Sequence, residues 1–156
     1  MAKKSAGILL YRFSEGQLEI LLGHPGGPFH ARKDLGAWSI PKGEFENEVP
    51  FEAAKREFLE ETGFEVEGEP IQLFPIKQAG GKIVYAWAVE QDIDAAKIKS
   101  NTFSLEFPPG SGSRNEYPEI DRAEWFPVPV ALEKINPAQA ALIRQLIKKL
   151  GLSDVG

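Results

Sequence analysis

The chain has 156 residues, of which 42% are hydrophobic and 26% charged, with a formal net charge of −5. Such a chain fits one folded domain that buries about two-thirds of its unfolded surface. The negative charge argues against a general nucleic-acid-binding surface, although a single polyphosphate ligand stays open, and the absence of cysteine excludes disulfides and thiolate chemistry.

The sequence also indicates where the protein resides. No apolar run approaches the roughly 20 residues that span a bilayer, and the start, MAKKSAG, lacks the long apolar region of a secretory signal. We therefore expect a cytoplasmic protein without a membrane partner.

The first elements predict a hairpin followed by a loop. Residues 6–13 (AGILLYRF) and 17–23 (QLEILLG) are short apolar runs separated by turn residues. Residues 24–36 (HPGGPFHARKDLG) are rich in glycine and proline and read as an exposed loop. Both histidines lie there, but a pair six residues apart without cysteines is a poor indicator of zinc.

Residues 37–43 (AWSIPKG) form a constrained turn that leads into the central helix. Lys42 puts a cation beside the helix start, whose free N–H groups already favour anions. Lys42 is therefore a candidate phosphate contact, with a solvent-exposed turn lysine as the alternative. Trp38 could stack on a nucleotide base or simply pack at the edge of the sheet.

Residues 43–64 (GEFENEVPFEAAKREFLEETGF) predict the central helix, because Pro50 suits a first helical turn and Gly63 a left-handed end. At about 100° per residue, four side chains form a stripe that can pack on a core. They are Phe51, Ala54, Phe58 and Thr62.

Three glutamates, Glu57, Glu60 and Glu61, fall together on the adjacent flank of this helix. Like charges at this spacing weaken a helix, so a cation placed over them would explain the cluster. Oxygen ligands without sulfur or imidazole select Mg²⁺, Mn²⁺ or Ca²⁺ rather than zinc. Taken alone, the cluster also fits a solvated face on which Arg56 and Glu60 make an ordinary i,i+4 pair.

Four segments follow the helix. Residues 65–66 and 71–77 read as strands, and we expect the second to pair as a hairpin with residues 82–90 (KIVYAWAVE). Residues 92–100 are too short and polar to assign.

The last segments alternate between strand, loop and helix. Residues 101–107 predict an edge strand, and residues 108–121 a long loop that is functional or disordered. Residues 122–128 predict a strand, 130–135 a helical turn and 137–150 a helix. Its expected core positions are Ala141, Leu142, Leu146 and Leu150. Alternating strands and helices favour a sheet covered on both faces.

The order of residues around the glutamates resembles the signature of the Nudix hydrolases, G-x₅-E-x₇-R-E-U-x-E-E-x-G-U, where U is a bulky apolar residue. Eight positions agree in type and spacing: Glu48, Arg56, Glu57, Phe58, Glu60, Glu61, Gly63 and Phe64. The sequence departs from the pattern at the front, because four residues rather than five separate Gly43 from Glu48. Within this resemblance, the Trp-x-x-Pro-Lys-Gly turn looks most like the diadenosine polyphosphate hydrolases.

The resemblance implies an α/β fold, a Nudix-like α/β/α sandwich in which a mixed β-sheet is flanked by helices and a loop–helix–loop carries the catalytic motif. It implies one Nudix hydrolase domain over residues 1–156. The activity it implies is divalent-metal-dependent cleavage, with Mg²⁺ or Mn²⁺, of the pyrophosphate linkage of a nucleoside diphosphate joined to another moiety. A dinucleoside polyphosphate is one such substrate.

The resemblance also assigns roles to residues. The metal ligands would be Glu57, Glu60, Glu61 and the backbone carbonyl of Gly43, with Arg56 orienting a carboxylate. Lys42 and Trp38 would contact the substrate. The general base would be Glu60 or Glu57, with Glu119 as the option outside the motif. Three further acids from later in the chain stay open as bases: Glu106, Glu116 and Asp121.

Two alternatives belong to other classes: a non-catalytic nucleotide-binding or regulatory module on the same scaffold, and a protein-interaction domain whose acidic helix is only solvated. The expected partner is a small-molecule nucleotide or polyphosphate, and nucleic acid only as a capped or triphosphate RNA end. Nucleotide sugars, ADP-ribose and oxidised nucleoside triphosphates stay open as substrates. Candidate stacking residues are Tyr85, Phe107 and Tyr117.

Overall fold

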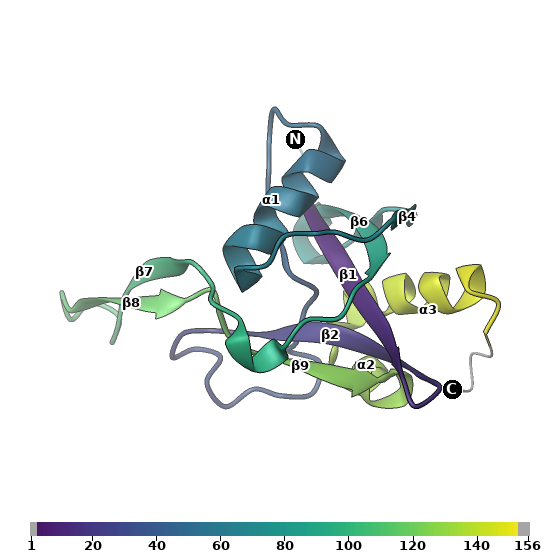
Figure 1. Cartoon of the computed structure of the whole chain (residues 1–156). Helices are drawn as coiled ribbons and strands as arrows, with labels where there is room; N and C mark the ends of the chain where they lie inside the picture. Colours follow the sequence, from purple (N-terminus) through teal and green to yellow (C-terminus); the bar gives the residue numbers. More distant parts are fainter. Residues whose placement is uncertain (1–2, 153–156) are drawn as a thin grey trace.

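A computed structural model describes residues 3–152, in which a seven-stranded mixed sheet has helices on both faces (Figure 1). The path through the sheet is β4-β6-β1-β2-β9, with β3 paired to β1 and β5 to β6. The strands are β1 (Lys4–Ser14), β2 (Gln17–Pro25), β3 (Lys42–Glu44), β4 (Pro70–Gln72), β5 (Ile76–Lys77), β6 (Ile83–Glu90) and β9 (Ile120–Pro127). β1 and β6 run parallel, whereas the neighbouring pairs are antiparallel.

A hydrophobic core lies on each face of the sheet. The strand β1 contributes to both cores because its side chains alternate between the two faces. Ile8 and Leu10 point into the core under α1 (Pro50–Thr62). Leu9 and Tyr11 point into the core under α2 (Val128–Lys134) and α3 (Ala140–Lys149). The run of apolar residues along β1 therefore reflects a strand buried on both faces.

The helix α1 begins and ends where the sequence predicts. Pro50 occupies its first turn, and Gly63 ends it with φ of 81°, donating its N–H to the Leu59 carbonyl. Ala54, Phe58 and Thr62 are fully buried, so the predicted stripe packs on the sheet. Glu57, Glu60 and Glu61 occupy the adjacent flank of the helix.

The predicted architecture is confirmed, and so are the first hairpin and the hairpin that ends in β6. Within residues 3–152 the chain also forms three short 3₁₀ turns, Ala79–Gly81, Ala95–Lys97 and Pro137–Gln139. The last of these precedes α3, so the predicted helix over residues 137–150 has a separate first turn. The ends of the predicted domain, residues 1–2 and 153–156, lie outside the described part of the chain.

The helical turn predicted over residues 130–135 is present as α2, although it begins earlier, at Val128. Several other local predictions are wrong. Residues 65–66 form no strand. In α3, Leu142 and Leu146 are buried as predicted and Leu150 packs partly against the core. Ala141 is exposed, and Ile143 and Ile147 are buried in addition.

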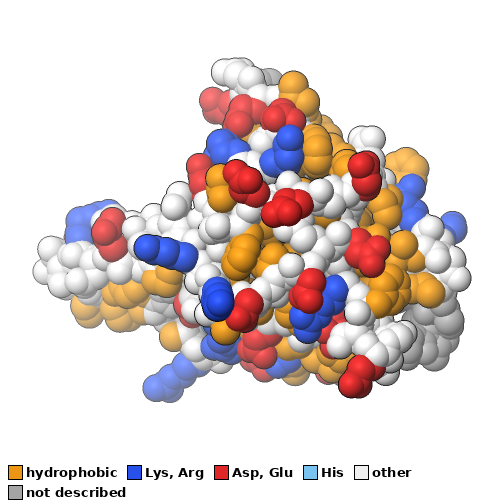
Figure 2. Space-filling model, viewed as in Figure 1, with side chains coloured by type: hydrophobic (Ala, Val, Ile, Leu, Met, Phe, Trp, Pro, Cys, Tyr) orange, Lys and Arg blue, Asp and Glu red, His pale blue; other side chains and the backbone are white. Residues whose placement is uncertain are grey.

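Another wrong prediction concerns the segment after β6. β7 (Thr102–Glu106) is not an edge strand of the main sheet but pairs with β8 (Arg114–Pro118) in a separate two-stranded sheet. Most of the loop predicted over residues 108–121 is therefore a hairpin, which projects from the body of the molecule (Figure 1). Hydrophobic side chains line the lower side of this projection (Figure 2).

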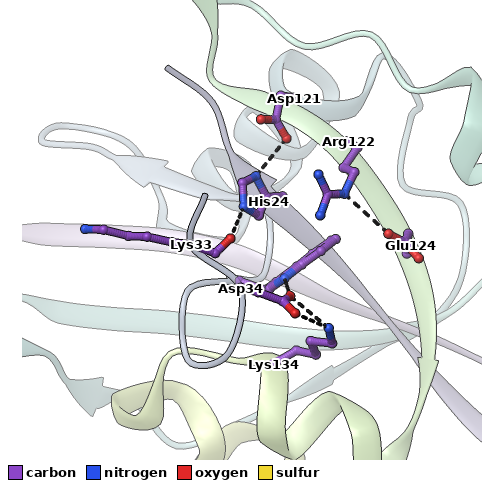
Figure 3. A network of polar contacts seen from close by, with 8 residues as sticks. His24, Lys33, Asp34, Asp121, Arg122, Glu124 and Lys134 are labelled. Carbon is purple, nitrogen blue, oxygen red and sulfur yellow. Dashed lines mark hydrogen bonds and ion pairs between the residues drawn. The ribbon is translucent and has the colours of Figure 1, made fainter. Parts of the chain in front are cut away.

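The loop after β2 is anchored by a buried histidine, contrary to the prediction that both histidines are exposed. His24 has no exposed surface, and its ring nitrogens lie 2.9 Å from Asp121 Oδ1 and 2.7 Å from the Lys33 carbonyl oxygen (Figure 3). Asp34 binds Lys134 Nζ of α2 at 2.6 Å. These contacts tie the loop to β9 and α2.

Candidate functional site

The site begins where the second half of α1 faces β3. A Cβ atom on Gly43 would lie 1.9 Å from Glu57 Oε1, a distance that real side chains do not reach. Only glycine lets the β3 backbone approach this carboxylate so closely. Glu57 itself is buried, with 9% of its surface exposed.

Arg56 holds two acidic side chains in place beside Glu57. Its guanidinium donates to both Glu48 oxygens, at 2.9 and 2.6 Å, and to Glu60 at 3.2 and 3.1 Å. These contacts raise the pKa of Arg56, chiefly through the Glu48 hydrogen bond. Arg56 also lies 3.6 Å from Glu57, so one cation orients the acidic flank of the helix. The shortened spacer after Gly43 leaves this pairing of Glu48 intact.

A cavity of about 420 Å³ opens over this flank. Glu57, Glu60 and Glu61 line it from α1, and Glu119 lines it from the segment between β8 and β9. The Oε2 atom of Glu61 is buried without a hydrogen-bond partner within residues 3–152. With Glu44 of β3, the cavity collects five carboxylates, and that of Glu61 has an unsatisfied oxygen.

Burial and mutual repulsion act on these carboxylates in the same direction. Burial, followed by the neighbouring Glu60, raises the pKa of Glu57 to about 7. Burial, followed by Glu119, raises the pKa of Glu61 to about 8, and burial also raises the pKa of Glu119. Several acids with raised pKa values in one cavity indicate a functional site more often than a structural one.

Cations line the same cavity. Lys42 comes from β3 and Lys82 from the residue just before β6, where it binds Glu44 at 3.2 Å. Burial, followed by the charge of Lys82, lowers the pKa of Lys42. The turn lysine singled out by the sequence is thus half-buried in the cavity rather than solvent-exposed.

Most of the predicted site residues meet at this cavity. Gly43, Glu57, Glu60, Glu61, Lys42 and Glu119 line it, and Arg56 supports it from behind. Of the four later acids, only Glu119 contributes to the lining. Glu106 instead accepts from the Gly110 N–H, Glu116 contacts Thr102 and Asp121 contacts His24.

Trp38 does not fit the predicted role of a stacking residue. Only 1% of its surface is exposed, its indole N–H donates to Asp34, and the rings of His24 and Phe126 pack against it. No base can reach the ring without unpacking the core. Trp38 instead matches the alternative expectation, a tryptophan packed in the core.

No local sequence signal indicates the other lining residues. Ser5 and Lys82 lie far from the motif in the chain and reach the cavity only because β1 pairs with both β3 and β6. The same holds for Asn101 and Thr102, which enter through the unexpected hairpin. A pattern search along one helix cannot find such residues.

The residues present fit a divalent cation, although the carboxylates are not gathered around one point. Within residues 3–152 no three Asp, Glu, His or Cys side chains meet in an arrangement that could hold a metal ion. The unpartnered Glu61 oxygen, the close approach of Gly43 to Glu57 and the all-oxygen donor set each match what Mg²⁺ or Mn²⁺ requires.

Comparison with protein families assigns the class. The NUDIX domain model matches residues 1–146, so the chain belongs to the Nudix family. The family match supports a pyrophosphohydrolase.

Solved structures agree on the fold. An Ap4A hydrolase from C. elegans, in a binary complex, is 23% identical with a TM-score of 0.66, over 96% of this chain and 98% of that one. The NUDIX domain of Shewanella oneidensis NrtR, complexed with ADP ribose, is 16% identical with a TM-score of 0.67, over 96% and 89% of the two chains.

Among curated proteins, an octanoyltransferase from Myxococcus xanthus is 31% identical over 115 residues, which is 73% of this chain. The match spans only 28% of the length of that relative, so the activity in its name does not transfer. Across residues 3–152, none of the helices has the length and apolar character needed to cross a membrane.

Proposed function

We propose that the chain is a Mg²⁺- or Mn²⁺-dependent hydrolase that cleaves the pyrophosphate linkage of a nucleoside diphosphate joined to another moiety. The observation that carries this proposal is the buried, unpartnered oxygen of Glu61 beside Glu57 and Gly43. A buried acid without a partner is costly, and a bound cation would remove that cost.

The proposed cation ligands are Glu57, Glu60, Glu61 and the Gly43 carbonyl oxygen. A divalent cation held there would neutralise phosphate oxygens and lower the pKa of a bound water. Arg56 keeps Glu60 directed at the cavity, and Gly43 fixes Glu57 by leaving room for its carboxylate. The site is thus preorganised by neighbours that need not touch the substrate.

The base is proposed among Glu57, Glu60 and Glu119. Glu119 lies across the cavity from α1, and burial raises its pKa toward the range in which an acid both accepts and releases a proton near neutral pH. That position supports Glu119 as the proton acceptor for the attacking water, while Glu60 stays paired with Arg56.

Lys42 is proposed to contact phosphate, because it is half-buried in the cavity and makes no ion pair within residues 3–152. Lys42→Ala should raise KM for polyphosphate substrates about tenfold while changing kcat less, since one charge-assisted contact is lost. Steady-state kinetics on the best substrate measure this, and unchanged KM would remove Lys42 from the site.

Dinucleoside polyphosphates and ADP-ribose head the proposed substrates. Dinucleoside polyphosphates are supported by the Trp-x-x-Pro-Lys-Gly turn and by the similarity to the C. elegans Ap4A hydrolase. ADP-ribose is supported by the ligand of the NrtR neighbour. A panel of these compounds, nucleotide sugars, capped RNA ends and nucleoside triphosphates, incubated with Mg²⁺ and analysed by chromatography, identifies the substrate. A nucleotide-binding module without activity would instead give shifts in melting temperature and no products.

Glu57→Gln and Glu61→Gln test the metal assignment. Each should lower kcat by orders of magnitude, because an amide binds a hard cation far less well than a carboxylate, while circular dichroism stays unchanged. Glu52→Gln is the matched control on the same helix, since Glu52 is exposed and pairs with Lys55. Near-normal turnover in both site variants would refute the assignment.

A further inference from the structure

The strand β9 contains an irregularity close to the end at which it meets the cavity over α1. In its pairing with β2, Arg122 lies opposite His24, but Ile120 lies opposite Pro25. One residue of β9, Asp121, is therefore left without a partner across the sheet, as in a β-bulge. Bulges often occur beside active sites, where they place a side chain that regular pairing would put elsewhere.

The carboxylate of Asp121 binds the buried ring of His24 (Figure 3). Asp121 Oδ1 lies 2.9 Å from His24 Nδ1, and the Lys33 carbonyl oxygen lies 2.7 Å from Nε2. A carbonyl only accepts hydrogen bonds, so Nε2 carries a proton, and a second proton lies between Nδ1 and the carboxylate. The ring therefore joins the bulged residue of β9 to the loop after β2.

Glu119 lies two residues before Asp121 and is held by its backbone. Its N–H donates to the Asn101 carbonyl at 2.8 Å, and its own carbonyl accepts from the Gly26 N–H at 3.0 Å. A Cβ atom on Gly26 would lie 1.9 Å from the Pro118 carbonyl oxygen, so the two segments touch. Regular pairing without the bulge would move this segment by one residue, about 3.3 Å along β2, and would take Glu119 from its place in the cavity.

We propose that His24 and Asp121 form a positioning pair, which stabilises the bulged register of β9 and thereby holds the carboxylate of Glu119 in the cavity beside the glutamates of α1. This inference rests on the proposed function, in which Glu119 accepts the proton of the attacking water. The cavity is lined by Glu119 but by neither member of the pair, so the pair acts through Glu119. A general base contributes about 10²–10⁴ in rate, and a misplacement of about 1 Å can cost about a hundredfold.

Two substitutions of Asp121 test whether the contact with His24 is needed. Asp121→Ala removes the contact, so kcat should fall about tenfold while KM stays within about twofold, because Glu119 is misplaced and the groups that bind substrate are not. Asp121→Asn can donate its amide N–H to Nδ1 of a neutral His24, so kcat should stay within about twofold of wild type. Steady-state kinetics with Mg²⁺ on the substrate found by the panel measure both.

Glu124→Ala is the matched control on the same strand, because it removes the ion pair with Arg122, at 3.4 Å, away from the bulge. It should leave kcat unchanged. The side chain of Asp121 is 31% exposed, so its truncation opens onto solvent and leaves no closed cavity. Asp121→Ala should therefore stay folded, which a melting curve checks.

A double-mutant cycle with Glu119→Gln shows whether the pair acts through Glu119. Glu119→Gln should lower kcat about a hundredfold. Adding Asp121→Ala to it should cause less than about a twofold further loss, because no base remains to be positioned. If the contact only anchored the loop, the two losses would multiply. That result, or near-normal kcat in Glu119→Gln, would overturn the proposal even in an active hydrolase.

Crystal structures of the two Asp121 variants give a readout that needs no substrate. In Asp121→Ala the Glu119 carboxylate should leave the cavity while α1 keeps its place, and in Asp121→Asn it should stay. An undisplaced Glu119 in Asp121→Ala would refute the positioning role. A protein that hydrolyses no nucleotide, yet shows the expected displacement, would overturn the proposed hydrolysis and support the pair.

Discussion

The position of Glu57 depends on the absence of a side chain at Gly43. Its backbone lies against the Glu57 carboxylate, where a Cβ atom would overlap both carboxylate oxygens at 1.9 and 2.1 Å. The departure from the Nudix pattern lies immediately after this residue. The structure shows that the shorter spacer preserves both the Gly43 contact and the bond from Arg56 to Glu48.

Gly43→Ala should lower kcat/KM about a hundredfold, because the added methyl group must push Glu57 out of position and small misplacements of catalytic groups have effects of this size. Steady-state kinetics on the substrate found by the panel measure the loss. The melting temperature without metal should change little, since Glu57 can rotate away. A variant with wild-type kinetics would mean that Glu57 does not need this position.

At the scale of elements, α1 is both a structural and a functional helix. Phe58 is fully buried against the sheet, between the positions of Glu57 and Glu60 in the sequence. The packing of Phe58 therefore fixes the rotation of α1 about its axis, and with it the direction in which the glutamates point. Thr62 closes the same face by donating its hydroxyl to the Phe58 carbonyl at 2.7 Å.

Phe58→Ala should reduce the free energy of unfolding by about 3–5 kcal/mol, as large-to-small changes in a core do. Leu59→Ala is the control, because Leu59 is 42% exposed and should cost less than about 1 kcal/mol. Urea unfolding of the two variants measures the difference. Equal losses would show that α1 is not held by the predicted stripe.

The helix and the first hairpin were predictable because their signals are local. Pro50, Gly63 and a 3.6-residue stripe lie within one segment, and so do the carboxylates. The β7–β8 hairpin was not predictable, since β8 (Arg114–Pro118) is polar, short and next to glycine and proline residues, and becomes a strand only by pairing with β7. The places of Ser5, Lys82 and the buried His24 were not predictable for the same reason, because their neighbours in the fold are distant in the chain.

At the scale of the whole molecule, the acidic cavity couples folding to pH. The pKa values of Glu57 and Glu61, raised to about 7 and 8, exceed the unfolded value of about 4.3. Between these limits the folded state binds more protons than the unfolded state, so its stability falls as pH rises. His30 acts in the opposite direction, because burial lowers its pKa.

In EDTA, the melting temperature should therefore fall by several degrees from pH 5 to pH 8, since one pKa unit is worth about 1.4 kcal/mol and each kcal/mol about 2–4 °C at this size. Glu61→Gln should flatten the slope, and His30→Gln should steepen it. Mg²⁺ should raise the melting temperature more at pH 8 than at pH 5, because it binds the ionised carboxylates and not the protonated ones. A slope in EDTA that is unchanged by Glu61→Gln would place the titrating groups elsewhere, whereas an equal effect of Mg²⁺ at both pH values would exclude these glutamates as its ligands.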